Sequence, residues 1–325
     1  MGHPLERIRL ASPFLLRTAE PPITAVFGRE VRSVSRLGKR IVLTFVTDTK
    51  KEEALHLVIH LMIAGRFRWK PAGAAVPGKV GLAAFDFGAA SKPTKKQTSA
   101  EKEAGTLILT EASSKKRASL HLVRGDAAMR ALAPDGIEVL DCSTTDFAAR
   151  LRSENHTLKR ALTDPHLFSG IGNAYSDEIL HHAQMSPVRL TSRLTDAEID
   201  RIHTSIREVL VAWTDRLRAR SGDFPEKVTA FQPEMAVHGK YGKPCPRCGT
   251  PVQRIRYAAN EMNYCPTCQT EGKLLADRSL SRLMRGDWPK SLEALEAKKE
   301  SSRAEKSEPA KEVKPQSDWL TRSRR

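Results

Sequence analysis

Four of the five cysteines in the chain stand in two closely spaced pairs: Cys245 with Cys248, and Cys265 with Cys268. Two Cys-x-x-Cys pairs separated by residues 249–264 can bring four thiolates to one tetrahedral metal ion, and this spacing is typical of a structural zinc ribbon. Gly249 directly follows the first pair, where a glycine permits the sharp reversal that such a site needs. We therefore expect one structural zinc ion. A pair of disulfides and a rubredoxin-like iron site are the alternatives that the spacing leaves open.

The composition indicates a reducing compartment and a polyanionic partner. The 325 residues include 54 Lys and Arg against 38 Asp and Glu, which gives a formal net charge of +16. Such an excess favours binding to nucleic acid, because neutralised phosphates release condensed counterions. The sequence contains no apolar run long enough to span a membrane and no signal-like block at its start. We expect a cytoplasmic protein in which Cys142, outside the two pairs, is an ordinary buried thiol.

Hydrophobic patterns divide the chain into a β-rich part and a helical part. Strand signals are dense in residues 24–125, most clearly at residues 40–46, 55–69, 106–110 and 118–123. From about Thr144 the period becomes helical. The strongest helix is expected from Thr195 to Arg220, because Thr195 and Glu198 have the spacing of a capping box. Its apolar stripe is expected to belong to the core: Ile199, Ile202, Ile206, Val209, Leu210, Trp213 and Leu217.

Two segments have compositions typical of disorder. Residues 88–105 are polar and rich in Lys, Ser and Ala, which indicates a disordered insertion between two strands. Residues 298–325 alternate Lys, Glu and Ser with almost no apolar residue, which indicates a disordered charged tail. Before this tail, we expect a short helical extension within residues 273–297.

A glycine-rich turn joins two short helices in the helical part. The first helix is expected over residues 155–162, and Gly170-Ile171-Gly172-Asn173 leads into the second. The glycines let the backbone approach a ligand closely, and the first amides of the following helix are available as donors. Such a turn can bind one DNA phosphate. Taken alone, an ordinary structural turn explains the same residues.

These motifs together resemble one known family. The segment from Gly170 to Glu178 closely resembles the helix–two-turns–helix signature of formamidopyrimidine-DNA glycosylases and endonuclease VIII. Residues 237–245 resemble the lead-in to that family's zinc finger, and residues 264–269 resemble its close. The resemblance covers roughly residues 20–270. It implies an α+β fold in which an N-terminal β-sandwich lies beside a helical domain with the helix–two-turns–helix turn and a zinc-ribbon finger.

The resemblance also implies an organisation and an activity. The β-sandwich is expected in residues 1–130, the helical domain in residues 144–228 and the zinc finger in residues 229–272. The implied activity is base excision repair, by a DNA glycosylase that is also an abasic-site lyase. Its partner is damaged double-stranded DNA, and we expect a monomer without a small-molecule cofactor. In the family, a base is flipped out, an amine attacks the sugar C1′ to form a Schiff base, and the sugar phosphate then eliminates.

Individual residues receive roles from the same resemblance. Lys39 matches a lysine that the family uses as a proton donor during elimination and as a phosphate contact. Ile63, in the segment His60-Leu61-Met62-Ile63-Ala64-Gly65, stands where the family has a gap-filling side chain. Arg117 stands where the family contacts the opposite strand, although Ala118 replaces the phenylalanine that stacks there. The expected DNA-binding residues are His60, Ile63, Arg117, Lys159, Gly170, Gly172, Asn173 and Asn260, and the expected zinc ligands are Cys245, Cys248, Cys265 and Cys268.

The sequence departs from the family at two positions that matter for chemistry. The family's nucleophile is an N-terminal proline followed by a glutamate, but this chain begins Met1-Gly2-His3-Pro4, and the nitrogen of Pro4 is an amide. We expect the true start to lie upstream; a non-catalytic relative that binds abasic or damaged DNA is the alternative. Asn260 stands where the family has an arginine that grips phosphates, and an asparagine cannot form that bidentate contact. A zinc-ribbon factor unrelated to repair, which binds RNA or another protein, is a third hypothesis.

Overall fold

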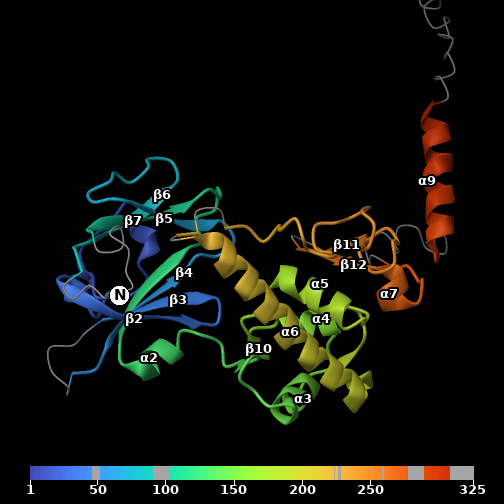
Figure 1. Cartoon of the computed structure of the whole chain (residues 1–325), viewed down its shortest axis with the longest axis horizontal. Coiled ribbons are helices and arrows are strands. Elements are labelled where there is room, and N and C mark those ends of the chain that lie inside the picture. Colours follow the sequence, from blue (N-terminus) through green and yellow to red (C-terminus); the bar gives the residue numbers. More distant parts are fainter. Residues whose placement is uncertain are drawn as a thin grey trace, which may run out of the picture.

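The computed structural model describes residues 1–45, 52–90, 103–222, 224–225, 228–257, 260–276 and 289–307. A β-domain built from the first third of the chain lies beside a helical domain, and a small β-hairpin element lies against the far side of the helices (Figure 1). The fold is therefore α+β, as the sequence predicts. Among the described residues, no helix is long and apolar enough to cross a membrane.

The β-domain is a sandwich of two four-stranded antiparallel layers. One layer contains β5 (Gly65–Pro71), β7 (Gly105–Glu111), β6 (Gly81–Phe87) and β1 (Pro4–Leu10), and the other contains β2 (Arg29–Leu37), β3 (Arg40–Phe45), β4 (Leu55–His60) and β8 (Ser119–Arg124). A short pairing of β1 with β2 joins the layers at one edge. Side chains from both inner faces, among them Phe45, Leu57 and Phe85, form one buried core between the layers.

The single β-rich stretch at residues 55–69 is in fact two strands. The chain reverses between β4 and β5 in a tight turn at residues 61–64, and the amide of Gly65 donates to the carbonyl of Leu61 at 2.9 Å. A Cβ at Gly65 would lie 2.2 Å from the carbonyl oxygen of Leu61, so only glycine fits this reversal. The continuous apolar alternation hides the turn, because the turn itself contains apolar residues.

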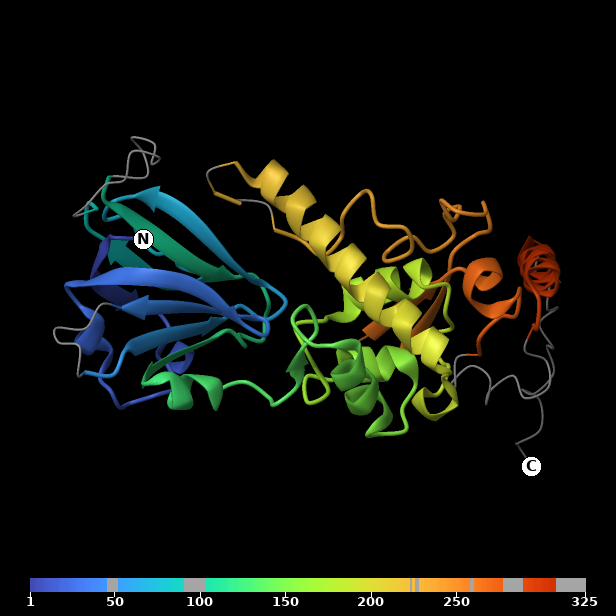
Figure 2. The ribbon, with the colours of Figure 1, turned by 60° about the horizontal axis from the view of Figure 1, so that its bottom comes forward.

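The helical domain packs four helices around a separate core. These are α3 (Thr144–Arg152), α4 (Leu158–Thr163), α5 (Asn173–His182) and α6 (Asp196–Ser221), preceded by α2 (Asp126–Arg130). Thr195 and Glu198 form the predicted capping box at the start of α6. The predicted stripe is confirmed at Ile199, Ile202, Ile206, Val209 and Trp213, which are buried, whereas Leu210 and Leu217 are half-buried. The C-terminal end of α6 points toward the β-domain (Figure 2).

The finger contains the hairpin β11 (Gln253–Tyr257) and β12 (Asn260–Tyr264), followed by α7 (Pro266–Thr270). Beyond it, α9 (Leu292–Ser307) stands away from the domains (Figure 1). The prediction of a disordered tail from residue 298 is therefore wrong for residues 298–307, because Ala, Glu and Lys are strong helix formers even without an apolar face. Residues 308–325 lie outside the described residues.

The two other predicted irregular segments are described only in part. Of the insertion at residues 88–105, residues 91–102 lie outside the described residues, while Gly105 is already the first residue of β7. Of the extension at residues 273–297, residues 277–288 lie outside them, residues 273–276 are not helical, and α9 begins at Leu292.

Candidate nucleic-acid interface

The four paired cysteines converge on one point. Their Sγ atoms lie within 4.8 Å of one another, and both measured cross-pairs are short: Cys245 to Cys268 at 3.9 Å and Cys248 to Cys265 at 3.4 Å. None of the four forms a disulfide. Gly249 has a positive φ of 75°, as the tight turn after the first pair requires. Four converging thiolates are the donor set of a structural zinc site, so these residues fit one zinc ion.

The helical domain supports this cluster from behind. The Nε2 atom of His181, on α5, lies 3.2 Å from the Sγ of Cys245, and burial lowers the pKa of His181 to about 4. Gln269 accepts from the amide of Cys265 at 2.8 Å and donates to the carbonyl of Met185 at 3.0 Å. Such contacts orient metal ligands and connect them to the rest of the fold.

The glycine turn has the backbone geometry that the sequence suggests. Gly170 has a φ of 92°, and a Cβ at this position would meet the guanidinium of Arg36 at 3.2 Å. Gly172 is the N-cap of α5, and the space where its Cβ would project is open. A glycine N-cap has no side chain to bond the first-turn amides of α5, so these amides can donate to an approaching anion.

A hairpin of the β-domain touches this turn directly. Lys39, at the turn between β2 and β3, donates from Nζ to the carbonyl of Ile171 at 3.1 Å. Beside it, Arg36 forms an ion pair with Glu138 at 2.8 Å. These two contacts join the β-domain to the helical domain at the glycine turn.

The finger touches the other side of the same turn. Asn173, the first residue of α5, donates from Nδ2 to the carbonyl of Glu261 in β12 at 2.9 Å. Asn260 is the residue before Glu261, and it begins β12 opposite Tyr257 at the tip of the hairpin. One hydrogen bond therefore connects Lys39 to the glycine turn, and a second connects the turn to the finger.

Lys159 is buried behind the turn and uses its ammonium within the protein. Its Nζ donates to the carbonyl of Asn173 at 2.7 Å and pairs with Asp177 at 2.5 Å. Burial lowers the pKa of Lys159, while the Asp177 carboxylate opposes this effect. The other oxygen of Asp177 contacts Nδ1 of His238 at 2.8 Å, in the lead-in to the finger. The ammonium of Lys159, an expected DNA-binding residue, thus makes contacts within the protein that support the turn from inside.

Glu178 fixes the lead-in of the finger to α5. Its carboxylate is buried and accepts from three consecutive amides: Ala236 at 2.7 Å, Val237 at 3.0 Å and His238 at 2.9 Å. Hydrogen bonds to an ionised carboxylate are among the stronger ones in proteins. The placement of the finger beside the glycine turn therefore depends on an acidic residue of the turn's own helix.

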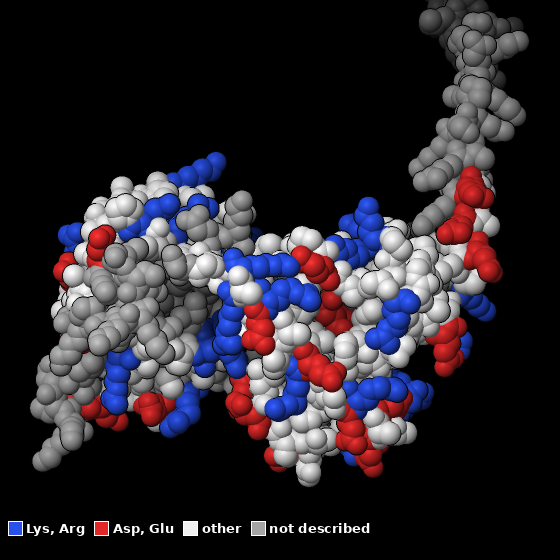
Figure 3. Space-filling model, viewed as in Figure 1, with Lys and Arg blue, Asp and Glu red and all other residues white. Residues whose placement is uncertain are grey.

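Basic side chains gather where the two domains meet (Figure 3). Five basic residues of the β-domain interact electrostatically with at least one other member of the group, and we call them the cation cluster: Arg17, Lys39, Arg40, His60 and His121. Burial lowers the pKa of Lys39, and Arg40 lowers it further. The pKa values of His60 and His121 are lowered in the same way, by burial first and by Arg40 next. In the described part of the chain no member of the cluster pairs with a carboxylate. An unneutralised, partly desolvated cluster of this kind favours a bound anion.

Ile63 projects from the turn that follows His60. It is 88 % exposed, and its carbonyl accepts from the guanidinium of Arg66 at 2.9 Å. The preceding residue, Met62, has a φ of 54°, a left-handed conformation that is uncommon outside glycine and often found at functional sites. An exposed apolar side chain on a fixed turn suits the expected role of a wedge.

Arg117 lies in the segment beside this turn. Gly65 pairs with Glu111 and His60 pairs with Ser119, so the turn at residues 61–64 and the segment at residues 112–118 are neighbours; we call them the loop rim. The buried carboxylate of Glu111 accepts from the amide of Arg117 at 2.9 Å and holds the segment in place. Ala118 is buried, so it offers no surface for stacking on a base.

Three supporting residues, Asp177, Glu178 and Glu111, receive no role from the sequence motifs. All three are buried acids: Asp177 pairs with Lys159, Glu178 holds the lead-in of the finger, and Glu111 holds the segment of Arg117. A signal for two of them is present in the sequence: Ala174, Asp177, Glu178 and His181 have the spacing of a buried helix face. Acids at such positions indicate buried partners.

Comparison with known proteins agrees with these features. Residues 1–121 match the formamidopyrimidine-DNA glycosylase N-terminal domain, residues 132–215 match the formamidopyrimidine-DNA glycosylase H2TH domain, and residues 242–270 match a zinc finger found in FPG and IleRS. The fold and the site thus define a class of proteins with a β-sandwich, a helix–two-turns–helix domain and a four-cysteine zinc finger.

Similar proteins identify the family. A formamidopyrimidine-DNA glycosylase of Deinococcus radiodurans is 30% identical over 291 residues, covering 86% of this chain and 93% of the relative. An uncharacterized formamidopyrimidine-DNA glycosylase-like protein of Mycobacterium tuberculosis is 41% identical over 157 residues, covering 48% of this chain and 96% of the relative. The chain belongs to the formamidopyrimidine-DNA glycosylase family.

Solved structures share the fold. The Lactococcus lactis Fpg in a complex with abasic-site DNA superposes with a TM-score of 0.67 at 23% identity, covering 83% of this chain and 93% of that one. The wild-type Lactococcus lactis FPG (MutM) in a complex with DNA containing an oxidized pyrimidine gives the same TM-score and coverage at 25% identity.

Proposed function

We propose that this protein binds damaged double-stranded DNA and acts in base excision repair as a DNA glycosylase and abasic-site lyase. The observation that carries this proposal is the pair of hydrogen bonds on either side of the glycine turn, from Lys39 to Ile171 and from Asn173 to Glu261. They bring the β-domain, the turn and the finger to one place beside the cation cluster. Relatives that match more than four fifths of this chain are named formamidopyrimidine-DNA glycosylases.

The cation cluster and the turn are proposed to bind the phosphates next to the lesion. Lys39 supplies positive charge and His60 supplies a ring N–H donor from the β-domain, and the amides after Gly170 and Gly172 supply donors from the helical domain. Asn173 exchanges its bond to the carbonyl of Glu261 for a phosphate oxygen, or keeps it and positions the turn. Lys159 acts as a positioning residue, because its ammonium already holds the carbonyl of Asn173 and the carboxylate of Asp177.

The loop rim is proposed to fill the space that the flipped nucleotide vacates. Ile63 provides an apolar wedge, and Arg117 contacts the opposite strand. The turn and segment that carry them are held by Gly65 and Glu111, respectively, so both side chains are presented by a fixed backbone.

Zinc is proposed to act only in structure. When bound by Cys245, Cys248, Cys265 and Cys268, it closes the finger and keeps the hairpin β11–β12 against α5. The tip of that hairpin carries Asn260, for which we propose a weaker, neutral phosphate contact in place of the family's arginine.

Lys39 is the residue of this chain best suited to proton transfer. Burial and the neighbouring Arg40 lower its pKa, which makes its ammonium a better acid than an exposed lysine. We propose that Lys39 donates a proton during elimination. The attacking amine must be unprotonated, which favours an N-terminal amine over an ordinary lysine.

The test separates binding from chemistry. Binding is measured by comparing a duplex that carries an abasic analogue with the intact duplex at the same salt concentration, and we expect tighter binding to the abasic duplex. Chemistry is measured by borohydride trapping on abasic DNA. We expect borohydride to trap a covalent adduct between the protein and abasic DNA. Equal affinity for the two duplexes would refute the proposal, and lack of any adduct would refute the lyase step.

A further inference from the structure

An exposed aromatic side chain lies next to the loop rim and has no role in the function proposed above. Phe14 belongs to η1 (Pro13–Leu15), a short 3-10 turn that begins with a proline. It is 77 % exposed, although its neighbour Leu15 is buried in the core of the sandwich. The backbone of Phe14 is therefore anchored while its ring is presented to the outside.

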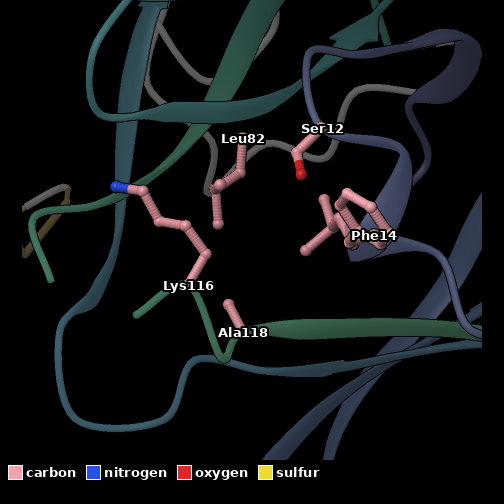
Figure 4. A pocket seen from close by; sticks show the side chains of 6 residues that line it. Ser12, Phe14, Leu82, Lys116 and Ala118 are labelled. Carbon is pink, nitrogen blue, oxygen red and sulfur yellow. The ribbon is translucent and has the colours of Figure 1, made fainter. Parts of the chain in front are cut away.

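Phe14 borders a small hollow on the surface of the β-domain. The hollow is lined by Ser12, Phe14, Leu15, Leu82, Lys116 and Ala118 (Figure 4). Phe14 and Leu82 lie on two sides of it, Ala118 lies at its edge, and the ammonium of Lys116 points away from it. Its lining is thus largely apolar, with one cation beside it.

The connections of η1 place this hollow at the end of the loop rim. Leu16 forms a bridge with Leu120, and the amide of Arg17 donates to the carbonyl of Leu120 at 2.9 Å. The chain around Phe14 therefore runs along the first residues of β8, directly after the segment at residues 112–118. Ile63, Arg117 and Phe14 lie on three adjacent segments at one edge of the sandwich.

We propose that Phe14 stacks on the base of the undamaged strand that is left unpaired opposite the lesion. This inference rests on the proposed function and names a further residue for it. A nucleobase is the occupant that we propose, because the exposed ring of Phe14 offers an aromatic face at the rim of the hollow, and the adjacent Lys115, Lys116 and Arg117 are exposed cations that complement the phosphates of the same strand. Phe14 thereby supplies, from another segment, the aromatic contact that the buried Ala118 cannot make.

The experiment compares two DNA duplexes and two variants. The first duplex carries an abasic analogue opposite an ordinary base, and the second carries abasic analogues in both strands, so that no base remains to stack. We expect Phe14→Ala to weaken binding to the first duplex by about 5- to 150-fold, the range for loss of one base–aromatic stack. On the second duplex its affinity stays within about twofold of the unmodified protein. Phe14→Trp retains the affinity of the unmodified protein for the first duplex.

Matched controls separate this inference from the function on which it rests. Val211→Ala alters an exposed apolar residue of α6 in the other domain and leaves both affinities unchanged. Equal losses for Phe14→Ala on both duplexes, or no loss on either, would overturn the stacking role while leaving the proposed function in place. If the unmodified protein does not prefer the abasic duplex over intact DNA, the proposed function fails first, and the role of Phe14 falls with it.

Discussion

The buried carboxylate of Glu178 offers the sharpest test of how the finger is held beside the glycine turn. It accepts three hydrogen bonds from the amides of residues 236–238, and all three depend on this one side chain. In Glu178→Ala these amides lose their acceptor, and each buried amide left unpaired costs about 1–3 kcal/mol. Even the lower bound gives about 3 kcal/mol in favour of opening the segment, which is roughly a hundredfold change in the opening equilibrium.

Glu178→Gln should give an intermediate result. One oxygen of the carboxylate accepts from Val237 and His238, and the other accepts from Ala236. A glutamine keeps one oxygen but places an amide donor where the second oxygen stood, so the bond to Ala236 is lost. The expected order of stability of the segment is Glu, then Gln, then Ala.

Hydrogen exchange and DNA binding measure the two consequences. We expect the amides of residues 236–238 to exchange roughly a hundredfold faster in Glu178→Ala, with a parallel loss of affinity for the abasic duplex. Zinc content should stay near one per chain, because the four thiolates are untouched. Glu234→Gln is the control, since this exposed carboxylate nearby pairs with Arg220. Unchanged exchange would contradict the structural role, and faster exchange with unchanged affinity would contradict the role of finger placement in binding.

Three further predictions follow from the interface. Cys265→Ser should release zinc, measured by a colorimetric chelator, and abolish DNA binding; retained affinity without zinc would contradict a structural finger. Lys39→Met should reduce lyase turnover at least tenfold more than it reduces DNA affinity, because a proton donor is lost; equal losses of turnover and affinity would leave Lys39 a phosphate contact only. Affinity for DNA should rise as the pH falls below the ordinary range of histidine, because phosphates raise the pKa of His60 and His121 from their lowered values and the complex therefore binds more protons than the free protein. A His60→Gln, His121→Gln double variant should bind with a flatter pH dependence, and an identical profile would contradict the involvement of these histidines.

The parts of the fold that depend on local patterns were predictable from the sequence. The spacing of Cys245, Cys248, Cys265 and Cys268 predicts a cluster that the structure contains, because a Cys-x-x-Cys knuckle brings its own two thiolates together. The capping box at Thr195 predicts the start of α6, because the bonds that form it span only three residues. Both predictions rest on short-range geometry.

The supporting contacts could not be predicted in the same way, because they join distant segments. From the sequence, Lys159 would be placed on the surface of a short helix. Its side chain is buried because it pairs with Asp177, which lies in the next helix. Glu178 reads as an ordinary helical acid until the amides of residues 236–238 are brought against it. Phe14 gives no sequence signal at all, since its position beside the loop rim follows from the pairing of Leu16 with Leu120.

Amide hydrogen exchange of the full chain, with and without the abasic duplex, tests most directly whether the β-domain, the glycine turn and the finger bind DNA together. We predict simultaneous protection of the turn at residues 61–64, the segment at residues 112–118, the glycine turn at residues 170–175 and the finger's lead-in at residues 236–243, saturating at one DNA concentration. Protection confined to one domain, or saturation of the β-domain and the finger at different DNA concentrations, would contradict the joint interface.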